Sequence, residues 1–192
     1  MSVTERLAVV TVGTDHHRFD RLMRWLEEWR DDRPDAFRWV VQHGASRPMT
    51  GAEGFAIRPR DEVLELLRQA AVVVTQGGPG GIMDARESGR LPIVVPRLAK
   101  LDEVVDDHQV SFTDQLAGRG LVVAAHTREQ LHAALDRALE RPADFLATGE
   151  ASDVPATVAR LEAAVAELVA RRPSRGRAPG RRWHRLGDQP AD

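Results

Sequence analysis

Short apolar runs alternate along this chain with longer segments in which apolar residues recur every three or four positions. The short runs are unbroken, which is typical of strands buried on both faces of a sheet. They cover residues 7–12, 37–42, 72–75, 92–95 and 121–124, with a shorter one at 54–57. The intervening segments predict helices over about residues 20–30, 63–70, 81–88, 107–117, from 127 onward, and 154–169. This alternation predicts an α/β fold, a single Rossmann-like, doubly wound parallel sheet.

Several residues mark where these elements begin and end. Gly13 and Thr14 follow the first apolar run, and Pro96 follows the fourth. Gly89 is predicted to end one helix and Gly118 another, because glycine adopts the left-handed conformation that closes helices. Thr127 is predicted to cap the following helix, with Gln130 completing a capping box.

The size and composition are those of one globular domain over residues 1–170. The chain has 192 residues, of which 42% are hydrophobic and 29% charged, and it contains no cysteine. Disulfides and thiolate metal sites are therefore excluded, which is compatible with a reducing cytosol. Charged residues occupy the N-terminus where a signal peptide would need its apolar stretch, and no apolar run approaches the ~18 residues of a membrane span. We expect a soluble, cytoplasmic protein.

The charge is distributed unevenly. Residues 1–170 carry 20 Lys and Arg against 27 Asp and Glu, whereas residues 171–192 carry 7 Arg against 2 Asp. The acidic body argues against nucleic acid as a partner. The tail is rich in Pro and Gly and lacks apolar periodicity, so it is predicted to be disordered. It is either simply solvated or makes peripheral contact with an anionic membrane or a partner.

A glycine-rich segment follows the apolar run 72–75 and carries the strongest chemical signal. Its four glycines are Gly77, Gly78, Gly80 and Gly81. Glycine permits positive φ and lets a phosphate approach the backbone without a clash with Cβ. Pro79 stiffens the segment, and the helix that follows adds its partial positive charge. A plain turn is the alternative, but a turn does not require four glycines, so the segment predicts a phosphate site.

The same segment excludes other phosphate motifs. Its spacing is not that of the dinucleotide fingerprint, and no Gly-Lys-Ser/Thr follows it. No Asp-x-Asp pair occurs anywhere in the chain, so we expect no metal bound by such a pair to neutralise the phosphates.

Two groups of polar residues follow the glycines. Asp84 lies six residues after Gly78, where a carboxylate can accept hydrogen bonds from both hydroxyls of a ribose. Its alternative role is that of an ordinary acid complementing the helix dipole. Asp106, Asp107, His108 and Gln109 open another predicted helix, as donors and acceptors for sugar hydroxyls or as an Asp N-cap with solvent-facing neighbours.

A third polar group follows the first apolar run. Asp15, His16 and His17 form it, and the histidines can titrate near neutrality. They are either solvent-exposed loop residues or candidates for proton transfer.

The run T-Q-G-G-P-G-G-I-M-D-A-R-E-S-G-R-L-P-I-V-V-P, followed by D-D-H-Q, resembles the nucleotide-sugar-binding half of GT-B glycosyltransferases. The closest type is the family 28 C-terminal domain. The opening V-T-V-G-T with F-D-R-L is similar to the small soluble subunits of two-chain N-acetylglucosaminyl- and exopolysaccharide transferases. The resemblance covers about residues 7–135.

The resemblance implies roles for individual residues. The ribose would bind Asp84, and Gly13 and Thr14 would face the donor phosphates. The sugar hydroxyls would bind His108 and Gln109, with Asp107 beside them. Relatives often carry His or Ser where this chain has Gln76, whose amide can bind a phosphate but cannot donate a proton as an acid. The pyrophosphate of UDP would bind the four glycines Gly77, Gly78, Gly80 and Gly81.

The resemblance also implies a divided enzyme. A complete GT-B enzyme needs two such domains, roughly 350 residues, so we expect the acceptor half to come from a membrane-associated partner subunit presenting a polyprenyl-linked acceptor. The predicted function is metal-independent, inverting transfer from a UDP-sugar, UDP-GlcNAc or another UDP-hexose, with no cofactor besides this co-substrate. His17 and His16 are the candidates for the general base by position, unless the partner supplies it. The alternatives are a non-catalytic nucleotide-sugar-binding or regulatory subunit and a free-standing sugar-nucleotide epimerase or hydrolase.

Overall fold

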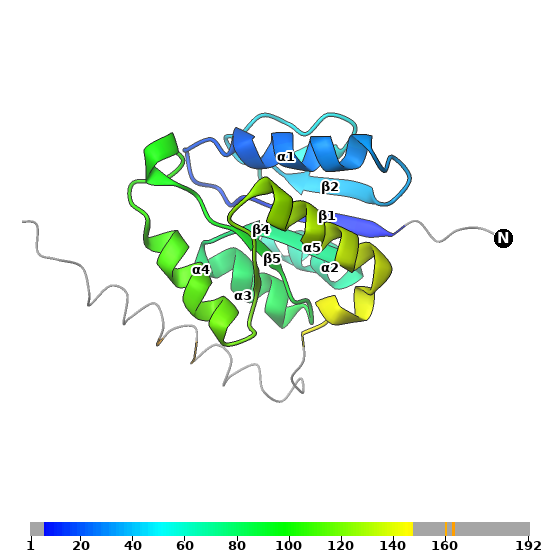
Figure 1. Ribbon diagram of the computed structural model, residues 1–192. Helices are drawn as coiled ribbons and strands as arrows, with labels where there is room; N and C mark the ends of the chain where they lie inside the picture. The colour runs from blue at the N-terminus through cyan, green and yellow to red at the C-terminus, as the bar shows by residue number, and fades with distance from the viewer. Residues whose placement is uncertain (1–5, 148–159, 161–162, 164–192) are drawn as a thin grey trace, which may run out of the picture.

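Six parallel strands form one sheet in the order β3-β2-β1-β4-β5-β6 (Figure 1). The computed structural model describes residues 6–147 together with Arg160 and Ala163. The all-parallel sheet confirms the predicted doubly wound α/β fold. The strands are β1 Leu7–Thr11, β2 Arg38–Gln42, β3 Glu53–Phe55, β4 Val72–Gln76, β5 Ile93–Val95 and β6 Val123–Ala124.

Helices cover both faces of this sheet. α1 (Asp20–Asp31) and α5 (Arg128–Glu140) pack on one face, and in Figure 1 α5 runs across the front of the strands. The other face is covered by α2 (Arg60–Gln69), α3 (Pro79–Glu87) and α4 (His108–Gly118). Two 3-10 turns, η1 (Ala99–Leu101) and η2 (Pro142–Phe145), complete the described elements.

The unbroken apolar runs become the central strands β1, β2, β4 and β5, whose residues are almost all buried on both sides, whereas the edge strand β3 is largely exposed. In β1, Val10 packs with the α1 and α5 side chains and its neighbour Val9 packs with α2 and α3. Burying each such side chain contributes about 1.5–3 kcal/mol. Trp29 of α1 stacks on Phe37 at a centroid distance of 5.6 Å, which anchors α1 over β2.

Most element boundaries agree with the sequence to within a few residues. α2 begins at Arg60, three residues earlier than predicted, and two further helix boundaries differ for local reasons. α3 begins at Pro79, two residues earlier than predicted, because proline fits the first helical position, where its missing N–H has no acceptor within the helix. α4 continues through Gly118, and Gly120 takes the left-handed conformation instead. The left-handed Gly89 after α3 and the capping box of Thr127 are both confirmed.

The predicted helix 154–169 lies outside the described residues except for Arg160 and Ala163, which are helical. The Arg-rich segment 171–192 lies outside them entirely. None of the helices in the described part of the chain is long and apolar enough to cross a bilayer.

The order of the strands places a topological switch point between β1 and β4. We call the region beyond the carboxyl ends of these two strands the crevice. The chain runs from β1 outward to β3, then returns to place β4 on the other side of β1. Loops that leave these two neighbours therefore diverge to opposite faces of the sheet. Ligands of doubly wound proteins bind at such a switch point, beyond the carboxyl ends of the strands.

Candidate functional site

Two buried threonines form the floor of the switch point. Thr11 ends β1 and pairs in register with Thr75 of β4, and their hydroxyl oxygens lie 3.1 Å apart. The first loop leaves β1 through Gly13, whose φ of 76° is the left-handed conformation that glycine adopts without strain. A Cβ at Gly13 would lie 3.4 Å from the side-chain nitrogen of Gln76. Gln76 therefore bridges the two loops that leave the crevice.

The glycine-rich segment is tighter than the sequence indicates. Only Gly77 and Gly78 form the loop, because Pro79 already starts α3. None of the four glycines uses the positive φ that glycine permits. They instead provide room: a Cβ at Gly78 would collide with the Gln76 side chain, and one at Gly81 would lie 2.6 Å from the Thr75 hydroxyl.

Gly80 differs from its three neighbours in facing open space. No atom of the described residues lies within 4 Å of a Cβ built on it, and the residue is exposed in the first turn of α3. The first N–H groups of a helix have no partner within the helix, and the helix dipole places roughly half a positive charge there. This turn can therefore donate hydrogen bonds to an anion that approaches over Gly80.

Asp84 lies in the second turn of α3 and is already paired. Its carboxylate accepts hydrogen bonds from Nε and Nη2 of Arg60 at 3.1 and 2.6 Å. The same guanidinium reaches Glu87 at 3.2 Å. Arg60, which the sequence reasoning missed, is the first residue of α2, and it therefore fixes Asp84 beside the opening of the crevice.

The loop between β5 and α4 carries the polar group 106–109. Asp107 occupies the N-cap position of α4, but its carboxylate accepts from the backbone N of Ala99 at 2.9 Å. Gln109 is only 6% exposed and accepts from the backbone N of Arg97 at 3.1 Å. A Cβ at Gly77 would lie 2.9 Å from that of Gln109. Gln109 thus packs under the glycine loop, while His108 remains exposed.

Two Asp-x-His pairs flank the crevice, one on each side. In the first loop, Asp15 Oδ1 accepts from the backbone N of His17 at 2.8 Å and lies 2.6 Å from its Nδ1. Asp106 makes the same two contacts with His108. The backbone hydrogen bond from His17 is the main cause that lowers the pKa of Asp15, so its carboxylate stays ionised. An ionised carboxylate only accepts hydrogen bonds, so the neutral imidazole of His17 would donate from Nδ1 to Asp15 and keep Nε2 as its acceptor.

The structure distinguishes the two histidines that the sequence left equivalent. The side chain of His17 is 15% exposed, whereas that of His16 is 84% exposed. With Asp15 they form a group whose possible ligand atoms lie within 4.8 Å of one another, a spacing that could hold a metal ion.

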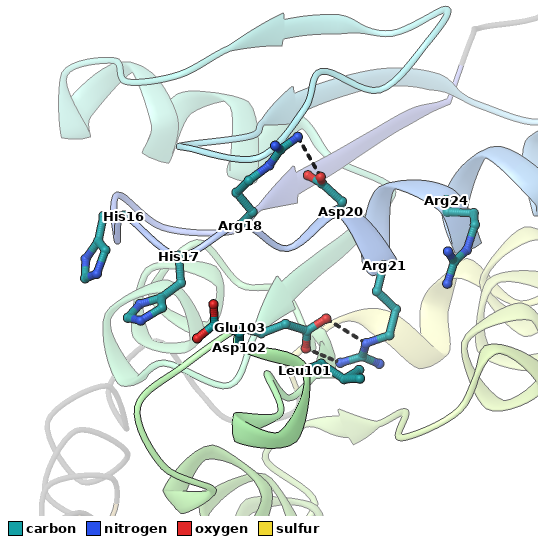
Figure 2. Close-up of a pocket in the computed structure, with 9 residues that line it drawn as sticks. All are labelled: His16, His17, Arg18, Asp20, Arg21, Arg24, Leu101, Asp102 and Glu103. Carbon is teal, nitrogen blue, oxygen red and sulfur yellow. Dashed lines mark hydrogen bonds and ion pairs between the residues drawn. The ribbon is translucent and has the colours of Figure 1, made fainter.

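A depression of about 770 Å³ lies beside the first loop, between the start of α1 and the segment around η1 (Figure 2). Figure 2 shows Arg21 and Glu103, which both line it, pointing toward each other, with hydrogen bonds of 2.9 and 2.7 Å between the guanidinium and the carboxylate. Both side chains are at most 10% exposed. This ion pair fixes the β5–α4 loop against α1, and the sequence reasoning did not identify it.

The sequence matches the glycosyltransferase family 28 C-terminal domain over residues 8–165. Among solved structures, the fold is similar to that of the glycotransferase of kitacinnamycin, with a TM-score of 0.55 and 24% identity over 89% of this chain and 44% of that chain. The glycosyltransferase SnogD from Streptomyces nogalater is less similar, with a TM-score of 0.45 and 16% identity over 84% of this chain and 45% of that one. This chain spans less than half the length of either. A comparison with curated proteins gives no match.

Proposed function

Since the chain belongs to the family of glycosyltransferase family 28 C-terminal domains, we propose that it is the donor-binding, catalytic subunit of a glycosyltransferase. Its donor is a UDP-sugar, either UDP-GlcNAc or another UDP-hexose. The sugar is transferred with inversion, and no metal or further cofactor takes part. The acceptor, a lipid-linked molecule, is presented by a membrane-associated partner subunit, which would hold this cytoplasmic chain at the inner face of the membrane.

The observation that carries this proposal is the convergence of three loops on the β1–β4 switch point. Gln76 packs against Gly13 on one side and Gly78 on the other, and Gln109 packs against Gly77. The open turn at Gly80 completes an anion site at the N-terminus of α3. We assign the diphosphate of UDP to this turn, with Thr14 and the Gln76 amide as further donors.

The remaining parts of the donor fall on the polar residues around the crevice. Asp84 accepts from the ribose hydroxyls, and Arg60 holds its carboxylate in place. His108 accepts from the hydroxyls of the sugar through Nε2, because its Nδ1 faces Asp106. Asp107 and Gln109 hold the loop on which His108 lies.

The chemical step follows from the Asp15–His17 pair. The acceptor hydroxyl gives its proton to His17 Nε2 while its oxygen bonds to the anomeric carbon. The bond between that carbon and the diphosphate breaks, and its electron pair leaves with UDP. Attack opposite the leaving group inverts the anomeric configuration. The donors at the N-terminus of α3 stabilise the charge that develops on UDP, as an oxyanion hole does.

A binding screen tests the donor assignment. Isothermal calorimetry with UDP, UDP-GlcNAc, UDP-glucose, GDP and TDP measures which nucleotide the chain prefers, and thermal shift gives an independent reading because a ligand bound only by the folded state raises Tm. We expect UDP and one UDP-sugar to bind most tightly. Equal or undetectable binding of all five would contradict the proposal. Unchanged donor affinity in the presence of EDTA is expected if no metal takes part, and the Asp15, His16 and His17 group makes this control necessary.

A second function is favoured by Gln76, which stands where a titratable residue would be needed for acid catalysis. The chain would then be a non-catalytic nucleotide-sugar-binding or regulatory subunit. Mixing the chain with candidate membrane partners, a lipid acceptor and radiolabelled UDP-sugar separates the two. Transfer that is lost in His17→Ala supports catalysis by this chain, whereas transfer that survives it assigns the base to the partner.

A further inference from the structure

A single arginine at the end of β5 holds the candidate site together. Arg97 is 2% exposed, although it is charged and follows Pro96 in a loop. Its Nη1 donates to the backbone oxygens of His17 and Glu103 at 2.8 and 2.9 Å, and its Nη2 donates to that of Val12 at 2.9 Å. The guanidinium therefore ties the first loop at both ends, before Gly13 and at His17, to the β5–α4 loop.

The backbone of Arg97 extends the same connection to the glycine loop. Its N–H donates to Gln109 Oε1 at 3.1 Å, and the Gln109 side chain packs directly against Gly77. Arg97 thus contacts the first loop and its own β5–α4 loop directly, and it is connected to the glycine loop through Gln109. No sequence pattern indicates this role, because Arg97 is one of 26 arginines and lies outside every motif.

No carboxylate of the described residues forms a direct ion pair with Arg97. Of the carboxylates nearest to it, Glu103 is bonded to Arg21 and Asp15 to His17. Burial lowers the pKa of Arg97, while Asp15 and Glu103 act in the opposite direction. Arginine nevertheless stays protonated in proteins, so a positive charge lies buried beside the switch point. A buried charge acts over a longer range than an exposed one, because less solvent screens it.

We propose that Arg97 is a positioning residue for the diphosphate of the donor. It orders the loop 13–17 against the glycine loop, and its buried charge favours an anion at the crevice. The identification of the anion as a diphosphate rests on the proposed function. The ordering of loop 13–17 by Arg97 does not depend on that function. Lysine cannot replace Arg97, because an ammonium group lacks the planar guanidinium fork that donates hydrogen bonds in fixed directions.

Two variants separate the fork from the charge. Arg97→Lys keeps the charge and loses the fork, and Arg97→Met loses both. Arg86→Lys is the matched control, since Arg86 is also partly buried and donates to the Leu121 backbone oxygen at 2.8 Å, away from the crevice. Amide hydrogen exchange of the ligand-free proteins measures loop order. Calorimetry with UDP and with uridine measures the contribution of the diphosphate.

We expect amide exchange at Asp15, His16 and His17 to rise at least roughly tenfold in both Arg97 variants and not in Arg86→Lys. UDP affinity should fall roughly tenfold in Arg97→Lys, about 1.4 kcal/mol, and further in Arg97→Met, with uridine affinity unchanged. A change in global stability alone would not alter the UDP-to-uridine affinity ratio of the folded protein. If Arg97→Met does not fold, Arg97→Lys carries the test.

The outcomes distinguish this inference from the proposed function. Wild-type protein that binds no UDP contradicts the proposed function, and the exchange data still decide the loop ordering. Wild-type protein that binds UDP, with Arg97→Lys binding it equally well and protecting the loop equally well, overturns the role of Arg97.

Discussion

Asp84 and Glu87 lie three residues apart on α3 and share the guanidinium of Arg60. The two carboxylates differ in their proposed roles, since only Asp84 is assigned to the ribose. This makes them a matched pair for testing the assignment at the scale of a single side chain.

We expect Asp84→Ala to lower UDP affinity by roughly 10- to 100-fold, because a hydrogen bond to a charged group contributes ~1.5–3 kcal/mol. Wild-type protein should bind UDP more tightly than 2′-deoxy-UDP, and the variant should bind the two alike. Calorimetry with both nucleotides measures this. Glu87→Ala is the control and should keep the wild-type preference. Loss of that preference in both variants would assign the effect to Arg60 instead.

The site residues that could be predicted from the sequence are those whose type is unusual at their position. Four glycines after a buried strand indicate a phosphate site, and a polar cluster after another strand indicates a second contact region. Arg60 and Arg97 could not be found this way, because arginine is the commonest charged residue of the chain and its long side chain reaches partners far away in sequence. The roles of Asp15 and Asp106 follow from hydrogen bonds to His17 and His108 that only the folded loops reveal.

At the scale of elements, the first turn of α3 contains Gly80 and Gly81, and we expect their substitution by alanine to have opposite effects on stability. Gly80→Ala should not lower Tm, since none of the described atoms lies within 4 Å of the added Cβ and alanine favours helix. The substitution should nevertheless weaken UDP binding, because the methyl group occupies the face of the anion site. Gly81→Ala should destabilise the fold by about 1–3 kcal/mol through contact with Thr75. Thermal melts and calorimetry measure both. Undiminished UDP binding by Gly80→Ala would move the phosphates elsewhere.

The loop between β2 and β3 is held against α1 by hydrogen bonds to one carboxylate. Glu27 of α1 accepts from Arg47 at 2.7 Å and from the backbone N of Thr50 at 2.8 Å. The hydrogen bond from Arg47 is the main cause that lowers the pKa of Glu27 from 4.5 to about 2. A lowered carboxyl pKa stabilises the fold above the unfolded value of 4.5, and this stability is lost as the pH falls toward 2.

We therefore expect Glu27→Gln to lower the free energy of unfolding by about 1–2 kcal/mol at pH 6, a value discounted because Arg47 is partly exposed to solvent. The difference from wild type should shrink below pH 4.5 and vanish near pH 2. Urea unfolding at several pH values measures it. Asp31→Asn is the control, because Asp31 is exposed at the end of α1 and pairs only with its neighbour Arg30 among the described contacts. A difference that stays constant with pH would mean that Glu27 acts through packing.

The elements themselves were largely predictable because the central strands lie in apolar runs and the helices between them have apolar residues at helical spacing. The boundaries that differed have local causes. Pro-Gly-Gly reads as a loop by helix propensity, yet proline fits the first turn of α3 and the neighbouring strands fix its direction. β6 pairs over only Val123 and Ala124, because β5 beside it is itself only three residues long.

At the scale of the whole molecule, exposed apolar residues gather at one edge. Ile57 follows β3, and Leu101 and Val105 follow β5, so these three lie at the carboxyl edge, where the crevice opens. Leu146, the fourth large exposed apolar side chain of the described residues, pairs with Arg90 just before β5, at the opposite edge. An acceptor-binding partner that faces the donor would cover the carboxyl edge.

We expect Leu101→Ser with Val105→Ser to weaken association with the proposed partner subunit at least roughly tenfold, since fully burying an apolar side chain contributes about 1.5–3 kcal/mol. UDP binding by the isolated chain should be unchanged. Leu146→Ser is the control and should associate normally. Biolayer interferometry with the partner in detergent measures all three, and equal association of every variant would place the interface on another face.

The hydroxyl pair of Thr11 and Thr75 joins positions that are 64 residues apart in sequence. Closing so long a segment is slow compared with forming helices or collapsing, so we expect β1 and β4 to meet late in folding. A nascent or partly refolded chain can hold most of its helices and still have no crevice. During refolding, the ability to bind nucleotide would consequently appear only after these two strands have paired. Nucleotide binding would therefore distinguish correctly folded molecules from compact ones in which the strands pair in the wrong register.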